Sequence, residues 1–108
     1  MSLVRKRLLF VDDEPGIRQT LPVILRKYGF AVTVTATVSE AIDEITKQCF
    51  DLLLCDLNLE REHDGFEVMR AIRNAHPSAV VIVLTHSLSL IDSDIHPFFS
   101  LRGFIRVT

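Results

Sequence analysis

The sequence predicts a single α/β domain in which helices cover both faces of an open parallel sheet. Short runs that are apolar along their whole length alternate with segments whose apolar residues recur at helical spacing. Strands that are apolar throughout are buried on both faces, which is typical of parallel sheets. Strand–helix units of this kind join by right-handed crossovers into a doubly wound sheet. The length of 108 residues suits one domain, and the hydrophobic content of 48% is close to the globular average.

The first strand is predicted at residues 8–11, and the acidic run 12–14 stops it. Pro15 suits the first turn of the helix that follows, because its missing N–H costs nothing there. Apolar residues continue at helical spacing until Gly29, which is typical of the residue that ends a helix. Pro22 falls inside this pattern, so we expect a kink or one weakened hydrogen bond.

The second strand is predicted at residues 30–35, which are rich in β-branched side chains. Thr37 and Glu40 then match the capping box that begins a helix. The expected apolar face of this helix consists of Val38, Ala41, Ile42, Ile45 and Cys49. Residues 51–56 are predicted to be a third strand, apolar until Asp56 closes it.

A polar segment, residues 57–63, leads to a third helix, for which Asp64 is the expected N-cap and Glu67 the residue at N3. This helix should end before Pro77, because the residue before a proline prefers extended geometry. A fourth strand is predicted at residues 79–84. Beyond it the pattern is weaker: a helical face at 88–95 and a fifth strand at 104–107.

Composition excludes several classes of function. The net charge of −2 gives no field that would hold nucleic acid or an anionic membrane. The longest apolar run, residues 79–84, is far shorter than the roughly 20 residues of a membrane-spanning helix. The basic run 5–7 follows two apolar residues, which is the reverse of a secretory leader. Cys49 and Cys55 form no CxxC pair and are expected to be buried free thiols, so we predict a cytoplasmic protein.

The candidate site lies where the predicted strands end. Asp12 and Asp13 follow the first strand, Asp56 closes the third and Thr85 follows the fourth. Ligands bind at this carboxyl edge in open parallel sheets. Three neighbouring carboxylates repel one another unless a cation joins them, and oxygen ligands with spare coordination positions favour Mg²⁺.

A carboxylate held beside Mg²⁺ can attack phosphorus and form an acyl phosphate. Asp56 is the expected nucleophile because it closes its strand alone, while Thr85 can offer a hydroxyl to a phosphoryl oxygen. Each residue also has a plainer interpretation. The acidic run 12–14 could be only a favourable helix start, Asp56 a solvated strand end and Thr85 a loop residue.

Three segments resemble the receiver domain of bacterial two-component response regulators, the CheY-like superfamily. They are LLFVDDEP at 8–15, DLLLCD at 51–56 together with DGFEV at 64–68, and VVIVLT at 80–85. The resemblance covers residues 5–85 well and the rest loosely. It implies a flavodoxin-like (βα)5 fold with strand order 2-1-3-4-5, and a single domain over residues 5–108.

The same resemblance implies a role for each site residue. Asp56 would accept a phosphoryl group from a sensor histidine kinase, a phosphotransfer protein or a small acyl phosphate. Asp13, Asp56 and the backbone carbonyl of Asn58 would bind Mg²⁺, with help from Asp12. Thr85 would be the hydroxyl that moves on activation and signals to an output domain absent from this chain. The domain would therefore be a signalling module rather than an enzyme, apart from its own phosphorylation and dephosphorylation chemistry.

The chain also departs from the family pattern. Receivers carry a lysine at the end of strand five, where this chain has Val107. His86 stands where the family has a small residue beside the phosphorylation pocket, and Phe104 is the candidate aromatic switch residue. These departures keep open a pseudo-receiver, an interaction module that phosphorylation does not switch. A Mg²⁺-dependent phosphatase with an aspartyl nucleophile is a weaker alternative, because such enzymes usually carry DxD after strand one.

A (βα)5 unit needs a helix after strand five, but the sequence stops at Thr108. We therefore expect the final helix to be missing and apolar surface near strands one and three to be bare. A partner subunit in a homodimer, a swapped element or a rearranged segment 88–101 could cover that surface.

Overall fold

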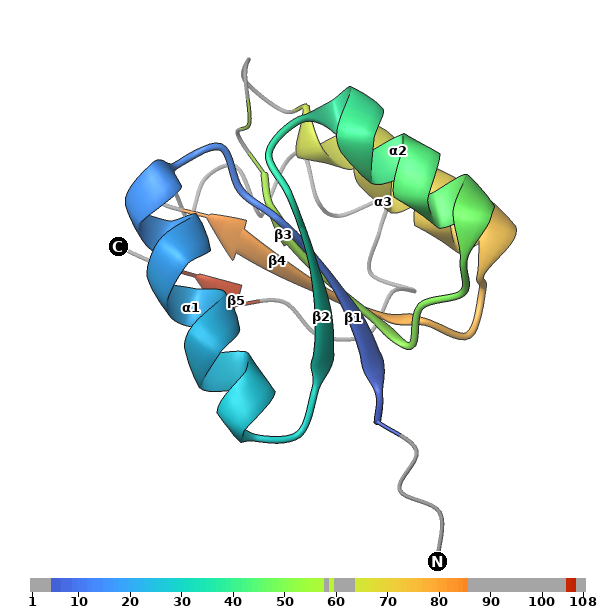
Figure 1. Ribbon diagram of the computed structural model, residues 1–108. Helices are drawn as coiled ribbons and strands as arrows, with labels where there is room; N and C mark the ends of the chain where they lie inside the picture. Colours follow the sequence, from blue (N-terminus) through green and yellow to red (C-terminus); the bar gives the residue numbers. More distant parts are fainter. Residues whose placement is uncertain (1–4, 58, 60–63, 86–104, 107–108) are drawn as a thin grey trace, which may run out of the picture.

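The computed structural model describes residues 5–57, 59, 64–85 and 105–106, and in this part strands and helices alternate (Figure 1). The strands are β1 (Arg7–Val11), β2 (Ala31–Thr35), β3 (Leu52–Asp56), β4 (Val80–Thr85) and β5 (Ile105–Arg106). The helices are α1 (Pro15–Lys27), α2 (Val38–Lys47) and α3 (Gly65–Ala75). All strand pairs are parallel and the order is β2-β1-β3-β4-β5. The predicted doubly wound class and its strand order are confirmed.

The helices lie on both faces of the sheet, α1 on one face and α2 with α3 on the other (Figure 1). Because side chains alternate along a strand, each central strand supplies both cores. Leu9, Val11, Leu53 and Cys55 pack with Met69 and other residues under α2 and α3. Leu8, Phe10 and Leu54 pack on the α1 side with Ile17, Leu21 and Leu25. The sheet is therefore buried on both faces, as its continuous apolar strands predict.

Gly29 ends α1 as predicted, and the backbone shows why glycine is needed. Its φ is +97°, in the left-handed region. Phe30 N–H donates to the carbonyl of Leu25 at 3.3 Å, and Gly29 N–H donates to that of Arg26 at 3.0 Å. These two bonds are the Schellman arrangement, which satisfies the last carbonyls of the helix. Pro22 is buried inside α1, and the helix runs through it.

The predicted caps of α2 and α3 differ in outcome. Thr37 accepts a hydrogen bond from Glu40 N–H at 3.1 Å, and the Glu40 carboxylate accepts one from Ala36 N–H at 2.8 Å. The capping box of α2 is therefore confirmed, with its return bond one residue earlier than usual. Asp64 stands at the N-cap position of α3, but its side chain makes no capping hydrogen bond and its backbone is already helical.

One expectation from the sequence is wrong. Cys55 is buried, but Cys49 is exposed, because α2 ends at Lys47 and Phe50 takes the buried position instead. The expected bare surface near strands one and three stays a prediction. Phe10 is fully buried and Leu54 is only 7% exposed, and segment 88–101, one of the elements expected to cover them, lies outside the described residues.

The predicted helical face at 88–95, together with Phe104 and Val107, lies outside the described residues. No helix in the described part of the chain is long and apolar enough to cross a membrane.

Replacing Gly29 with alanine should lower the free energy of unfolding by about 1–2 kcal/mol, because a side chain disfavours the left-handed conformation. No atom lies within 4 Å of the added Cβ, so the cost is one of backbone conformation alone. Urea unfolding measures it. The matched control is Gly16→Ala, which also has open space around its Cβ but lies within α1, and should be neutral or slightly stabilising. Equal stability of the two variants would contradict this account.

Candidate metal centre at the carboxyl edge of the sheet

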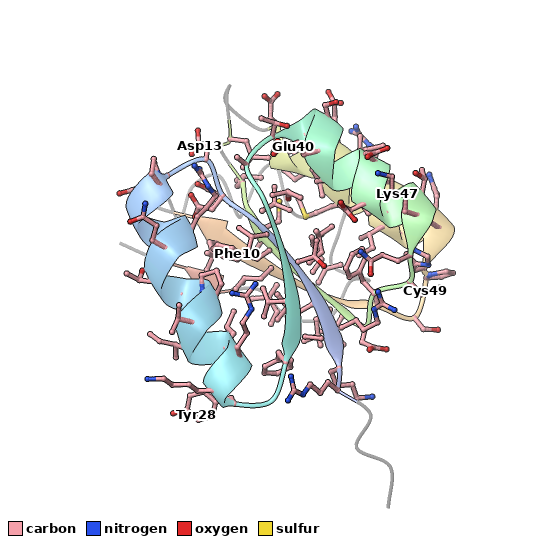
Figure 2. The ribbon with its side chains drawn as sticks, viewed as in Figure 1. Phe10, Asp13, Tyr28, Glu40, Lys47 and Cys49 are labelled. Carbon is pink, nitrogen blue, oxygen red and sulfur yellow. The ribbon has the colours of Figure 1, made fainter. Side chains whose placement is uncertain are left out.

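Three carboxylates meet at the carboxyl edge of the sheet. Asp12, Asp13 and Asp56 each offer an oxygen atom, and these atoms all lie within 4.8 Å of one another. The register of the sheet explains why these acids meet. Val11 of β1 is paired with Cys55 of β3, so the acids that follow these two residues lie at the same level of the sheet. Figure 2 shows Asp13 at this edge, with Tyr28 at the opposite end of α1. The predicted convergence of the three acids is present in the structure.

Asp12 is the most enclosed of the three acids, with 5% of its surface exposed. Its Oδ1 accepts a hydrogen bond from Glu14 N–H at 2.9 Å, and its own N–H donates to the carbonyl of Thr35 at 3.1 Å. Burial raises the pKa of Asp12, and the charges of Asp13 and Glu14 add to that effect. The Glu14 N–H and the charge of Arg18 lower the pKa and oppose the rise. A carboxylate in this position gains from a neighbouring cation.

Arg18 links α1 to the acidic loop. Its Nη1 donates a hydrogen bond to the backbone carbonyl of Asp12 at 3.1 Å. The guanidinium therefore holds the loop from the α1 side and brings a positive charge near the carboxylates. The sequence analysis did not identify Arg18 as a site residue. Its position one turn into the helix that follows the acids could have indicated the role.

The backbone around the half-buried Asp56 is held from two sides. Leu57 N–H donates to the carbonyl of Leu84 on β4 at 3.0 Å, and Gly65 N–H donates to the carbonyl of Leu57 at 2.8 Å. The start of α3 comes so close that a Cβ on Gly65 would lie 2.5 Å from the Asp56 carbonyl oxygen. Glycine is therefore required for α3 to pack against the end of β3. No pattern in the sequence indicates this contact, because it depends on the tertiary arrangement.

Thr85 is the last residue of β4, and Asp56 is paired with Leu84 just before it. The backbone of Thr85 thus reaches the same edge as the acids. The placement of the Thr85 side chain is not described, and the predicted site residues Asn58 and His86 lie outside the described residues.

The donor set fits a hard divalent cation. Three carboxylate oxygens within reach of one another, with Asp12 the most enclosed, suit Mg²⁺, which binds through one or two carboxylates and keeps several waters. Asp12, Asp13 and Asp56 are the described residues that would hold the ion. Open coordination positions would remain for a phosphate oxygen.

The fold and this acidic edge define a CheY-like α/β domain with its functional site at the carboxyl ends of the central strands. The family model for the response regulator receiver domain matches residues 8–95. The chain belongs to this family, whose members are the receiver domains of two-component systems. Receiver domains of the family bind Mg²⁺ through acidic residues and interact with histidine kinases and output domains.

Relatives of known sequence are longer proteins. The chain is 32% identical over 85 residues to the transcriptional regulatory protein ZraR of Klebsiella oxytoca, which covers 79% of this chain and 19% of that protein. It is 33% identical over 92 residues to the DNA-binding response regulator MtrA of Mycolicibacterium smegmatis, covering 85% of this chain and 40% of the relative. The chain thus spans less than half the length of these relatives.

Solved structures share the fold over most of this chain. The chemotaxis response regulator CheY4 of Vibrio cholerae superposes with a TM-score of 0.82 at 26% identity, covering 95% of this chain and 87% of that one. The response regulator protein TrrA of Thermotoga maritima, solved in complex with Mg²⁺ and BeF, gives a TM-score of 0.81 at 26% identity with the same coverage.

Replacing Gly65 with alanine should push α3 away from the end of β3 or displace Asp56, because the atoms that the Cβ meets all belong to backbone. We expect a loss of about 1–3 kcal/mol in the free energy of unfolding, the usual cost of overpacking. Mg²⁺ binding, measured by calorimetry, should weaken as well. A Gly65→Ala variant that matches Gly16→Ala in both stability and Mg²⁺ affinity would show that the contact does not matter.

Replacing Asp12 with asparagine should stabilise the protein when no divalent cation is present. A raised pKa means that the stability contributed by Asp12 is complete below its unfolded-state pKa and is lost as the pH rises through the folded-state pKa. Asparagine keeps an oxygen for the Glu14 N–H and removes the charge, which relieves repulsion of about 1–4 kcal/mol between charges some 4 Å apart.

Urea unfolding in EDTA measures this difference from about pH 4, near the ordinary pKa of an aspartate, up to pH 8. The wild type should lose stability relative to Asp12→Asn as the pH rises. A variant that is less stable than the wild type throughout this range would contradict the prediction.

Proposed function

We propose that this receiver domain accepts a phosphoryl group on Asp56 in a Mg²⁺-dependent reaction and switches conformation to control an output. The observation that carries the proposal is the cluster of three carboxylates within 4.8 Å, drawn from the ends of β1 and β3. Asp56 ends β3, whereas Asp12 and Asp13 both follow β1. Asp56 can therefore act as the nucleophile while Asp12 and Asp13 serve as metal ligands.

The chemistry is an in-line phosphoryl transfer. A carboxylate oxygen of Asp56 attacks phosphorus and forms an acyl phosphate. The bond from phosphorus to the donor breaks at the same time, and its electron pair leaves with a histidine nitrogen of a kinase or with the oxygen of a small acyl phosphate. Bound Mg²⁺ supplies positive charge that neutralises the phosphoryl oxygens.

The residues of this chain prepare the site for that transfer. The Glu14 N–H orients the Asp12 carboxylate, and Arg18 holds the backbone of the same loop. Bonds to β4 and α3 hold the backbone next to Asp56 on its C-terminal side. Effective positioning of a nucleophile is a large part of such catalysis, because the protein performs little covalent chemistry itself.

Three further roles belong to the same proposal. Thr85 provides the switch hydroxyl, which is supported by the position of its backbone beside Asp56 and Leu84. The backbone carbonyl of Asn58 completes the Mg²⁺ ligands, since it lies two residues beyond Asp56 in the chain. His86 follows Thr85 in the chain, and its proposed role is to limit the access of a donor or of water to Asp56.

The proposed partners follow from the family. The phosphoryl group comes from a sensor histidine kinase or a phosphotransfer protein in the cytoplasm. The output lies in another domain or protein, because the chain spans 19% and 40% of two relatives named as regulators of transcription or as DNA-binding. The domain has no other enzymatic activity in this proposal.

Phosphorylation can be tested by intact mass after incubation with acetyl phosphate and MgCl₂. The wild type should gain the mass of one phosphoryl group and Asp56→Asn should gain none. Asp43→Asn is the matched control, because Asp43 is an exposed acid whose partner is Lys47, and it should behave as the wild type. No gain in the wild type, with a cognate kinase or without one, would refute the proposal.

The pseudo-receiver alternative predicts a different pattern. Val107 stands where receivers carry the lysine that contacts the phosphoryl group, so the wild type could be phosphorylated without switching. Hydrogen exchange of the phosphorylated wild type and of Val107→Lys separates the two functions. A receiver changes its exchange on phosphorylation, and the added lysine should enlarge that change. An interaction module shows no change in the wild type.

A further inference from the structure

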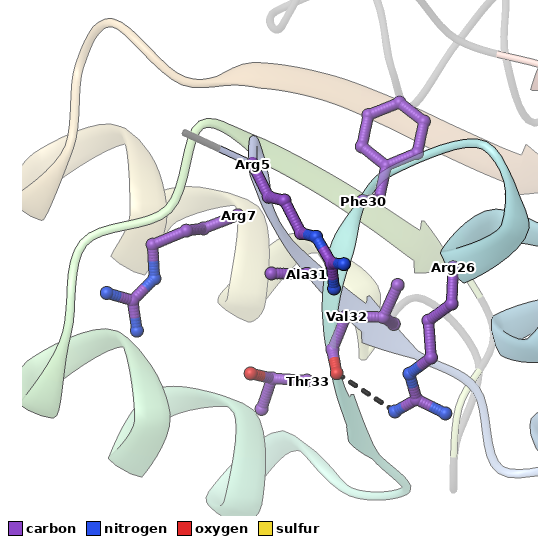
Figure 3. A pocket seen from close by; sticks show the side chains of 7 residues that line it. All are labelled: Arg5, Arg7, Arg26, Phe30, Ala31, Val32 and Thr33. Atoms are coloured by element: carbon purple, nitrogen blue, oxygen red, sulfur yellow. Dashed lines mark hydrogen bonds between the residues drawn. The ribbon is translucent and has the colours of Figure 1, made fainter. Parts of the chain in front are cut away.

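A basic hollow lies at the amino edge of the sheet, at the opposite end of β1 from the carboxylates. Figure 3 shows it at the start of β2, with Arg5 two residues before β1, Arg7 at the beginning of β1 and Arg26 from the end of α1. The ring of Phe30 forms part of its wall together with Val32 and Thr33. Its volume is about 510 Å³, which lies within the usual range for small-molecule sites.

The arginines of this hollow have few partners within the protein. Arg26 uses Nη2 to donate to the carbonyl of Val32 at 3.0 Å, which fixes its guanidinium beside the edge of β2 (Figure 3). In the part of the chain that the structure describes, the guanidinium groups of Arg5 and Arg7 make no hydrogen bond or ion pair. Asp51 is an acid on this side of the sheet, but its Oδ2 accepts the backbone N–H of Arg7 at 2.8 Å. The hollow therefore carries uncompensated positive charge.

This combination selects a particular ligand chemistry. Guanidinium groups bind phosphate oxygens in a bidentate manner and keep their charge at all physiological pH values. Arg5 and Arg26 supply two positive charges for an anion of two linked phosphate groups, and the Arg7 guanidinium, which points away from these two in Figure 3, adds attraction at longer range. A single carboxylate would leave part of this charge uncompensated. The Thr33 hydroxyl can donate to an anion, and the Phe30 ring offers an apolar surface for a planar group.

We propose that this hollow binds a small anion with two adjacent phosphate groups, such as a nucleoside diphosphate. Arg5 and Arg26 hold the phosphates from the two sides of β2, Arg7 adds charge, and Phe30 lies against the organic part. The site is separate from the carboxylates, because the five residues of β1 span roughly 17 Å between them. Its ligand cannot touch Asp56, so the proposal stands independently of the phosphorylation chemistry.

Titration calorimetry on the full chain tests the proposal, with inorganic pyrophosphate and adenosine diphosphate as probes in EDTA. The absence of divalent cations keeps the probes away from the carboxylate cluster. Both probes should bind the wild type, and Arg5→Gln should weaken binding about tenfold or more, the effect of losing a charge-assisted hydrogen bond. Arg26→Gln should do the same, although it also removes the hydrogen bond to Val32. Arg5→Gln guards against an effect on folding, because the Arg5 side chain makes no hydrogen bond or ion pair with the described residues.

Arg73→Gln is the matched control, since Arg73 is an exposed arginine in the last turn of α3, away from the hollow. It should bind both probes as the wild type does. Tighter binding of adenosine diphosphate would identify an organic ligand, whereas equal binding would identify an inorganic one, and both results support the site. No binding by the wild type, or equal weakening in Arg73→Gln, would overturn it.

Discussion

The repulsion among three carboxylates at one edge of the sheet is the constraint on which the site depends. The parallel register of β1 and β3 brings Asp12 and Asp13 level with Asp56, and the folded chain cannot separate them without breaking that register. Burial of Asp12 makes the clash more costly, because a desolvated carboxylate disfavours its charge. A bound divalent cation would relieve this repulsion, because its positive charge lies between the carboxylates.

The rest of the fold holds the cluster rigid. Strands buried on both faces fix the ends of β1 and β3, and α3 begins so close to β3 that only glycine fits at residue 65. Arg18 ties the acidic loop to α1 on the other side. Charge is thereby divided between the two ends of β1, with acids beyond Val11 and the arginine-lined hollow around Arg7.

Much of this could be predicted from the sequence, because the decisive signals are local. The predicted strand 51–56 is observed as Leu52–Asp56, and an acid at the end of an apolar run is visible in the chain itself. The exposure of Cys49 was missed because the helical pattern continues past Lys47, where α2 ends. The close approach at Gly65 and the bond from Arg18 were missed because they depend on how distant elements pack. The local periodicity of apolar residues therefore predicts the strands, the helices and the acidic edge of the sheet. It does not predict the tertiary contacts that hold the site in place.

The central claim is that the three carboxylates form one cation site, and the stability of the folded chain as a function of Mg²⁺ tests it most directly. A ligand that binds only the native state adds RT ln(1 + [L]/Kd) to the free energy of unfolding. We expect the free energy of unfolding, measured in urea, to rise continuously with the concentration of MgCl₂. The substitution Asp13→Asn should largely remove this rise. If NaCl of equal ionic strength stabilises the wild type as much as MgCl₂ does, the carboxylates do not form a cation site and the account is wrong.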